Sequence, residues 1–357
     1  MSQPHLQPLE ASRPPIETSL FDFFKVGPGP SSSHTIGPMK AGYDFLERCR
    51  ALPEDTLAQA ASLRMELLGS LSATGVGHGT NTAVLAGLLG SRPETCSPEV
   101  LPSLSRNPEA RHEVSIGGRR LRVGLADVVF GPVLHDAPYS NTLRASLRDA
   151  HDKALFEMEY YSVGGGFIQW KGWTPPERGK PVYPYGTMRE LRAQLARTGL
   201  TLHELILENE TAITGMSRPT IFEQLEDIMD AMYDSVRRGL AATGKLPGTL
   251  GVWRKAGGLL DRAKQLPFTV DRFLAKLNAY AFAVSEENAS GGVIVTAPTC
   301  GAAGVMPALL YAMRNDMNIG GRALREGLLA SAAVGYLAKH NAGIAGAEVG
   351  CQGEVGV

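Results

Sequence analysis

The stretch that decides the fold is WTPPERGKPVYPYGT, residues 173–187. Its prolines stand at positions 175, 176, 181 and 184, and proline at this density excludes a helix interior and favours an extended linker. Strand-like alternation and glycine turns come before this stretch, whereas long segments of helical periodicity come after it. We therefore expect an α+β protein with a disordered tail at 1–17, an α/β domain at 18–172, a linker at 173–187 and a helical domain at 188–357.

Hydrophobic periodicity and capping residues predict the elements on each side of the linker. Before the linker we expect helices at 20–25, 38–49 and 80–89, strands at 63–68 and 154–163, and a hairpin over 113–116 and 119–125. After it we expect helices at 188–197, 202–211, 220–242, 271–287, 303–314 and 322–339. Residues 91–110 show no periodicity and are expected to form a loop.

The composition is that of a globular protein with a balanced charge. Lys and Arg number 35 and Asp and Glu number 36, so the net charge of −1 argues against a surface built for nucleic acid or anionic membrane. The four cysteines include no CxxC pair, so we expect free thiols in a reducing cytoplasm. The longest uncharged stretch, 288–313, is rich in Gly, Pro, Ser and Thr, and we interpret it as core and loop, not as a membrane span.

Residues 29–38 read GPSSSHTIGP and lie just before an expected helix. The free N–H groups and positive end of a helix attract anions, so this segment suits a substrate carboxylate or phosphate. The same hydroxyls also suit an elaborate helix cap. Spacing alone leaves both interpretations open.

A second glycine-rich segment, TGVGHGT at 74–80, lies between an expected strand and an expected helix. It departs from the GxGxxG dinucleotide fingerprint, because Thr80 stands where the third glycine belongs. Its glycines allow the backbone to approach a small molecule, with His78 at the crest of the loop. A structural histidine is the alternative interpretation.

Three further segments carry weaker signals. The triple glycine in YYSVGGGF, 160–167, suits either a phosphate-cupping loop of pyridoxal-phosphate enzymes or a strand end with a backbone nest. No lysine stands in an obvious Schiff-base motif. Cys300, before a helix, is either a nucleophile or a small loop residue, and Cys351 among glycines is either a ligand to an exposed cofactor or a loop thiol.

Taken together, these segments are more specific than any one of them. In order they read SLFDFFKVGPGPSSSHTIGP (19–38), TGVGHGT (74–80), YYSVGGGFI (160–168), EENASGG (286–292), VTAPTCGAAGV (295–305) and KHNAGIAGAEVGCQGEVG (339–356). This set resembles the bacterial iron–sulfur-dependent L-serine dehydratases (L-serine ammonia-lyases) of the single-chain type, over residues 18–357. The resemblance implies an N-terminal domain like a regulatory amino-acid-binding domain and an all-helical catalytic domain.

The resemblance also implies the activity and the cofactor. The expected reaction is β-elimination of water from L-serine to give pyruvate and ammonia, a step of amino-acid catabolism and gluconeogenesis, with a [4Fe–4S] cluster as the Lewis acid. Cys351 matches the first cluster cysteine, whereas Cys300 stands where the family usually has Asn. The family continues beyond residue 357, where its other two cluster cysteines lie. We therefore expect a truncated chain whose catalytic domain is incomplete and whose single matching thiolate assembles no cluster.

The expected chemistry assigns roles to specific residues. Removal of the α-proton of serine needs a base, and we expect His78 to be that base, with His34 as a second catalytic residue. The residues expected to bind the substrate are Ser31, Ser32, Ser33, Thr35, Gly79 and Asn288. We expect a cytoplasmic homo-oligomer, a dimer, that acts on L-serine and binds neither nucleic acid nor membrane.

Two other functions remain open at this point. The chain would be a catalytically inactive amino-acid-binding fragment if the segments that complete the active site are missing. A pyridoxal-phosphate-dependent lyase is the other alternative, and it would require a lysine and show the absorbance of an internal aldimine.

Overall fold

A five-stranded sheet forms the core of the N-terminal half in the computed structural model, which describes residues 14–341. Its strand order is β5-β2-β6-β7-β8. All neighbours are antiparallel except β2 and β5, which run parallel. The strands are β2 (Ser62–Gly69), β5 (Val128–Phe130), β6 (Asn141–Arg148), β7 (Ala154–Ser162) and β8 (Ile168–Trp170).

Helices cover one face of this sheet because its strands alternate between buried and exposed residues. Alternate residues of β2 and β6, such as Leu63, Leu67, Leu143 and Leu147, are buried in one apolar cluster. The helices α2 (Gly37–Arg50) and α6 (Thr80–Leu88) pack on that cluster. The remaining elements of this half are η1 (Ser32–Ile36), α3 (Glu54–Gln59), α4 (Ser70–Ala73), α5 (Gly75–His78), α7 (Val100–Arg106), β3 (Arg111–Ile116), β4 (Arg119–Gly124) and η2 (Leu125–Asp127).

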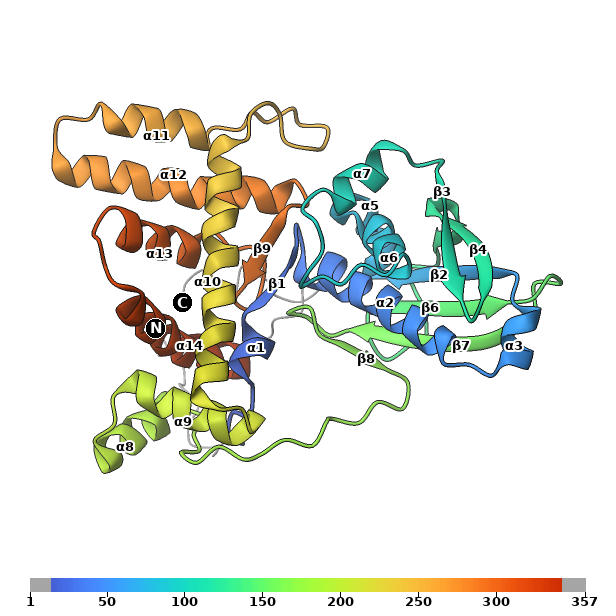
Figure 1. Cartoon of the computed structure of the whole chain (residues 1–357), viewed down its shortest axis with the longest axis horizontal. Coiled ribbons are helices and arrows are strands. Elements are labelled where there is room, and N and C mark those ends of the chain that lie inside the picture. Colours follow the sequence, from blue (N-terminus) through green and yellow to red (C-terminus); the bar gives the residue numbers. More distant parts are fainter. Residues whose placement is uncertain (1–13, 342–357) are drawn as a thin grey trace, which may run out of the picture.

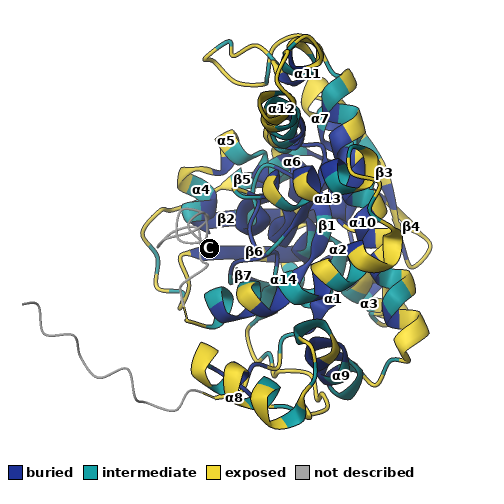
Figure 2. Cartoon of the chain, turned by 90° about the vertical axis from the view of Figure 1, so that its left-hand side faces the viewer, coloured by how far each residue is buried: buried dark blue, intermediate teal, exposed yellow. Residues whose placement is uncertain are grey.

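The C-terminal half is built from helices around a second apolar core. The long helix α10 runs through the middle of this half (Figure 1) and contributes Leu225, Met232 and Tyr233 to the core. The helices are α8 (Met188–Thr198), α9 (Leu202–Thr214), α10 (Arg218–Ala241), α11 (Ala256–Lys264), α12 (Thr269–Ala289), α13 (Val305–Asn315) and α14 (Gly321–Asn341). Figure 2 shows buried positions gathered inside both halves and exposed positions on α8 and α11.

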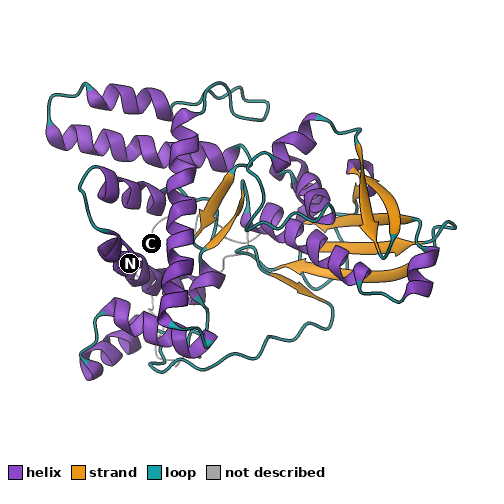
Figure 3. Cartoon of the chain, viewed as in Figure 1, coloured by secondary structure: helices purple, strands orange, loops and turns teal. Residues whose placement is uncertain are grey.

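The α+β class is confirmed, and Figure 3 shows most strands gathered in one half and most helices in the other. One strand lies in the described part of the helical half, β9 (Val293–Thr296), and it pairs antiparallel with β1 (Lys25–Pro28). The expected helix at 20–25 is shorter than predicted, since the helix α1 (Leu20–Phe23) ends at Phe23 and the chain turns into β1. Phe23 and the preceding Leu20 pack in the helical core, so the start of the chain holds the two halves together.

Most predicted elements form where periodicity is strong. The hairpin β3–β4 turns at Gly117 and Gly118, whose φ angles of 52° and 77° match the tight turn that two glycines favour. Residues 174–180 lack regular secondary structure (Figure 1), and the domain boundaries around them stay a prediction. The prediction for 91–110 was wrong at α7, a short helix that packs on α6 through Leu101 and Leu104. Within residues 14–341, no helix has the length and hydropathy to cross a membrane.

A close crossing of α2 and α6 sets the geometry of the N-terminal half. A Cβ atom on Gly87 of α6 would lie 2.1 Å from the Met39 carbonyl oxygen of α2. A Cβ atom on Gly42 of α2 would lie 2.5 Å from the Val84 carbonyl oxygen of α6. The two backbones are therefore in contact, and only glycine fits at either position.

Replacing Gly87 with alanine should push these helices apart. We expect Gly87→Ala to lower the free energy of unfolding by about 1–3 kcal/mol, the usual cost of overpacking. Gly258→Ala in α11 is the matched control, because its new Cβ would meet no atom within 4 Å and alanine favours helix by up to about 1 kcal/mol. Urea unfolding of both variants measures the effect, and equal stability of the two would contradict the close crossing.

Candidate active site

The crossing of α2 and α6 brings together the segments that precede the two helices, 31–36 and 74–79. The His34 and His78 rings lie with centroids 4.8 Å apart and planes tilted by 41°. The Thr35 hydroxyl donates a hydrogen bond of 2.9 Å to the His78 carbonyl oxygen. Two segments that are distant in sequence therefore form one site with a pair of imidazoles.

The SSSHT segment is both a helix cap and a wall of this site. Ser31 Oγ accepts from the His34 N–H at 3.1 Å, and the Ser31 N–H donates to Thr35 Oγ1 at 3.3 Å, as a cap requires. The cap interpretation is thus confirmed for Ser31 and Thr35. The Ser32 hydroxyl makes no hydrogen bond within residues 14–341, although its residue is 4% exposed. Ser32 therefore keeps a hydrogen-bonding group for a ligand.

His34 is a buried imidazole held between two hydroxyls. Its Nδ1 lies 2.9 Å from Ser33 Oγ, and its Nε2 lies 3.0 Å from Ser70 Oγ. Burial, together with the neighbouring His78, lowers the pKa of His34 to about 4. His34 is consequently neutral at pH 7, so one hydroxyl donates to its bare nitrogen and the other accepts from its N–H.

His78 has the tautomer that a general base needs. Its Nδ1 lies 2.9 Å from the Thr74 carbonyl oxygen. A carbonyl can only accept, so Nδ1 carries the proton and Nε2 of the neutral ring has a free lone pair. A Cβ on Gly77 or Gly79 would meet no atom within 4 Å, so the two residues that flank His78 leave open space at their α-carbons. Gly79 also has a φ of 62°, which explains glycine there independently of any ligand.

The triple-glycine segment and the strand before it pack against η1, which carries His34. Ser162 Oγ donates to the Ser33 carbonyl oxygen at 2.7 Å. A Cβ on Gly166 would lie 2.9 Å from Ile36 Cγ2, so this loop packs directly on η1. All three glycines have positive φ, as expected for a strand that ends in a tight turn.

The EENASGG segment reaches the site from the helical half. A Cβ on Gly29 would lie 2.3 Å from Asn288 Oδ1, so Asn288 packs against the chain that leads into η1. Asn288 Oδ1 is buried and has no hydrogen-bond partner within residues 14–341. An unpaired buried acceptor is costly, and a donor on a ligand would satisfy it.

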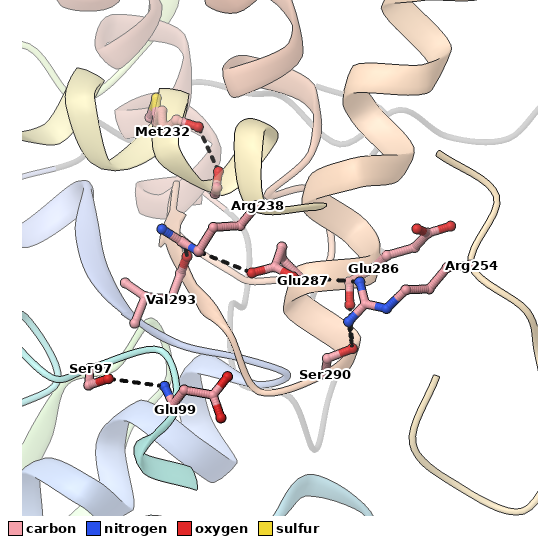
Figure 4. A network of polar contacts seen from close by, with 10 residues as sticks. Ser97, Glu99, Met232, Arg238, Arg254, Glu286, Glu287, Ser290 and Val293 are labelled. Carbon is pink, nitrogen blue, oxygen red and sulfur yellow. Dashed lines mark hydrogen bonds and ion pairs between the residues drawn. The ribbon is translucent and has the colours of Figure 1, made fainter. Parts of the chain in front are cut away.

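Polar contacts hold Glu286, Glu287 and Ser290 in place at the end of α12 (Figure 4), on either side of Asn288. Glu287 accepts a hydrogen bond from Arg238 Nε at 3.1 Å, and Ser290 Oγ accepts from Arg254 Nη2 at 2.6 Å. Glu286 accepts from the Lys255 N–H at 2.7 Å. Both carboxylates of this segment therefore have structural partners, which orient the end of α12.

The described cysteines do not form the donor set of a metal cluster. Cys351 lies outside the described residues. Burial raises the pKa of Cys49 to about 12 and that of Cys96 to about 11, so neither is a ready thiolate. Cys300 is 3% exposed, within an apolar cluster that includes Ile294 and Ala303. Among residues 14–341, no group of three or more His, Cys, Asp or Glu side chains is arranged to hold a metal ion.

Most residues predicted for the site meet in the structure, and two further residues of the site were not predicted. His34, His78, Ser31, Ser32, Ser33, Thr35 and Gly79 meet in space, and Asn288 reaches the loop that enters η1. Ser70 and Thr74 were missed, although they bond the two imidazoles. The available signal was the sequence GS at 69–70, because a small hydroxyl residue directly after a strand often lies at a functional loop.

Two regions of the chain match known protein families. Residues 19–173 match the family described as serine dehydratase beta chain, and residues 197–357 match that described as serine dehydratase alpha chain. The chain belongs to the serine dehydratase family. The candidate site includes residues from both matched regions, because segments 31–36 and 74–79 lie in the beta-chain region and Asn288, which packs against Gly29, lies in the alpha-chain region.

Several relatives carry both regions in a single chain. This serine dehydratase is 37% identical over 351 residues to L-serine dehydratase 2 of Escherichia coli, covering 95% of this chain and 75% of that protein. It is 40% identical over 352 residues to the L-serine dehydratase of Streptomyces coelicolor, with coverage of 95% and 75%. The L-serine dehydratase of Mycobacterium tuberculosis is 38% identical over 349 residues, again with coverage of 95% and 75%.

The lowered pKa of His34 makes the protein sensitive to acid. In the unfolded chain His34 binds a proton near its ordinary pKa of about 6.5, whereas the folded protein binds it only near 4. The unfolded state therefore holds more protons between these values, and His34 removes up to about 3 kcal/mol of stability as the pH falls from 6.5 to 4. Above pH 6.5 His34 is unprotonated in both states, so it does not reduce the stability there.

We expect His34→Gln to flatten the pH dependence of stability in that window. Urea unfolding from pH 7 to pH 4 measures it, with His151→Gln on an exposed loop as the control. An equally steep loss of stability in His34→Gln and in the unmodified protein would show that His34 is not the group responsible.

Proposed function

We propose that this serine dehydratase removes water from L-serine to give pyruvate and ammonia, and that His78 is the base that takes the α-proton. The observation that supports this proposal most directly is the free Nε2 lone pair of His78. The Nδ1–H of the same ring donates to the Thr74 carbonyl oxygen. The relatives named as L-serine dehydratases, matched over 95% of this chain, support the choice of substrate.

The pairing of the two imidazoles favours proton removal at His78. When Nε2 accepts the α-proton, His78 becomes a cation whose Nδ1–H still points at the Thr74 carbonyl oxygen, 2.9 Å away. A second imidazolium 4.8 Å away would oppose that charge. His34 avoids this repulsion because its pKa of about 4 keeps it neutral. We therefore assign His34 the role of a neutral neighbour that stays hydrogen-bonded to Ser33 and Ser70.

The substrate's own charges fit the remaining polar groups. The Ser32 hydroxyl is the one member of the SSS run that makes no hydrogen bond within residues 14–341, and we propose that it donates to the serine carboxylate. The buried Asn288 Oδ1 is an unpaired acceptor, and we propose that it accepts from the substrate ammonium group. Ser31 and Thr35 hold the turn in shape, and Gly79 leaves room beside His78.

The [4Fe–4S] cluster that the family resemblance implies stays a prediction. When bound, such a cluster supplies a Lewis acid for the departing hydroxyl. The described residues do not provide its donor set, and the expected ligand Cys351 lies outside them, so no step is derived through the cluster. Iron and sulfide analysis of the full-length protein and of Cys351→Ser tests the assignment.

The cytoplasmic location and the homodimer also stay predictions. Light scattering of the purified protein tests the dimer directly. The inactive-fragment alternative predicts that serine binds without the release of pyruvate, whereas the proposed function predicts both. A single assay for binding and product in the same sample distinguishes the two.

Loss of the base should reduce turnover strongly. We expect His78→Ala to lower kcat by about 10²–10⁴-fold, the usual contribution of general base catalysis, with little change in serine binding. His151→Ala, on an exposed loop, is the matched control and should leave kcat unchanged. Retention of near-normal turnover by His78→Ala would refute the assignment.

Loss of the Ser32 hydroxyl should instead act on KM. A hydrogen bond to a charged group contributes about 1.5–3 kcal/mol, so Ser32→Ala should raise KM for serine by at least about 10-fold while kcat stays similar. Ser33→Ala should change kcat as well, because Ser33 also bonds His34. Ser103→Ala on the exposed side of α7 is the control. An unchanged KM in Ser32→Ala would leave only the cap role for this run.

A further inference from the structure

Lys25 is a buried lysine where the sheet half meets the helical half. It lies in β1, and the residue is 7% exposed. Its ammonium nitrogen lies 2.9 Å from the centroid of the Phe167 ring, which follows the triple glycine. The proposed serine reaction gives this group no role.

A second lysine, which is half-buried, reaches the same ring. Lys339 lies in the last turn of α14, and its ammonium nitrogen is 4.9 Å from the Phe167 centroid. It donates a hydrogen bond of 3.1 Å to Thr18 Oγ1. Two ammonium groups, from β1 and from α14, therefore share one aromatic ring.

Within residues 14–341, neither ammonium group has a carboxylate partner at ion-pair distance. The acidic groups around Lys25 are all engaged by other cations. Asp22 pairs with Arg178, Glu94 with Lys40, Asp44 with Arg48 and Glu47 with Arg50.

An unpaired buried ammonium group is costly. A cation on an aromatic ring is stabilised when it is desolvated, whereas the burial of an unpaired charge carries a larger cost. Burial accordingly lowers the pKa of both lysines, and the positive charges of Lys40 and Lys339 lower the pKa of Lys25 further. A carboxylate on a ligand would stabilise the charged form of Lys25.

A cavity with room for such a ligand lies beside Lys25. Lys25 and Phe167 line a space of about 350 Å³ together with Tyr43, Ile168 and Trp170. The rest of the lining is charged and consists of Asp22, Lys40, Asp44 and Glu47. Aromatic walls suit a ligand with a small apolar body, and the three carboxylates disfavour a polyanion.

We propose that this cavity binds a small monocarboxylate, whose oxygens pair with the ammonium group of Lys25 while its carbon chain lies against the aromatic side chains. The site is separate from the imidazole pair but adjoins the same loop. A Cβ on Gly166 would lie 3.4 Å from Lys25 Cδ and 2.9 Å from Ile36 Cγ2 of η1.

Calorimetric titration of the full-length protein with propionate tests the proposal. We expect Lys25→Met to weaken propionate binding at least 10-fold, since that variant keeps the shape of the side chain and removes its charge. Lys40→Met is the matched control, because Lys40 lines the same cavity but already pairs with Glu94 at 3.5 Å. Ser32→Ala removes the serine site's carboxylate contact and should leave this binding unchanged.

A proton signature in the unmodified protein provides a second test. A bound carboxylate raises the pKa of Lys25, so at alkaline pH binding should be accompanied by uptake of protons. Titration in two buffers of different ionisation enthalpy measures this uptake, which Lys25→Met should abolish. The other groups that act on Lys25 are Lys40, Asp22, Lys339 and Glu94, and Lys40→Met should keep the uptake.

Several results would overturn the proposal. Absence of propionate binding to the unmodified protein would do so even if Lys25→Met failed to fold. Equal binding by Lys25→Met, or loss of binding in Lys40→Met, would remove Lys25 from the site. Binding of sulfate as tight as that of propionate would contradict the preference for a monocarboxylate. Loss of binding in Ser32→Ala would assign the propionate to the serine site.

Discussion

The backbone contact between α2 and α6 is the constraint on which the active site depends. Glycine at 42 and 87 allows the two helices to touch, and the segment before each helix carries one of the two imidazoles. Because the helices cannot slide apart without losing this contact, His34 and His78 stay 4.8 Å apart. The serine hydroxyls and the open space at Gly79 belong to the same arrangement. Ser162 stabilises it through a hydrogen bond to the Ser33 carbonyl oxygen.

The two imidazoles of the site have different properties because their surroundings differ. His34 is enclosed between two hydroxyls, and burial holds its pKa at about 4. His78 is partly exposed, with Nδ1 on a backbone carbonyl and Nε2 free. We propose that one imidazole is kept neutral so that the other can accept a proton without a second positive charge beside it. Two groups of one type obtain different roles in this way.

Local patterns in the sequence predicted much of this arrangement, and long-range contacts account for what was missed. Helical periodicity predicted α10, α12 and α14 closely, because each buries a regular stripe of residues. The SSSHT and GHG segments were singled out from their residue types, and the resemblance to the dehydratases assigned them to a site. The pairing of β1 with β9 was missed, since neither short strand carries a signal of its partner at the other end of the chain. The Ser70 contact was missed for the same reason, because only the fold brings Ser70 to His34.

The open space beside Gly77 and Gly79 permits a direct test of the central claim that His78 is the base. Free imidazole added to His78→Ala can enter the space left by the ring and accept the α-proton in its place. We predict that imidazole restores serine turnover to His78→Ala in proportion to the concentration of its neutral form, and leaves His34→Ala unaffected, because His34 is 4% exposed. Recovery of His34→Ala with no recovery of His78→Ala would contradict the account and assign the base to His34.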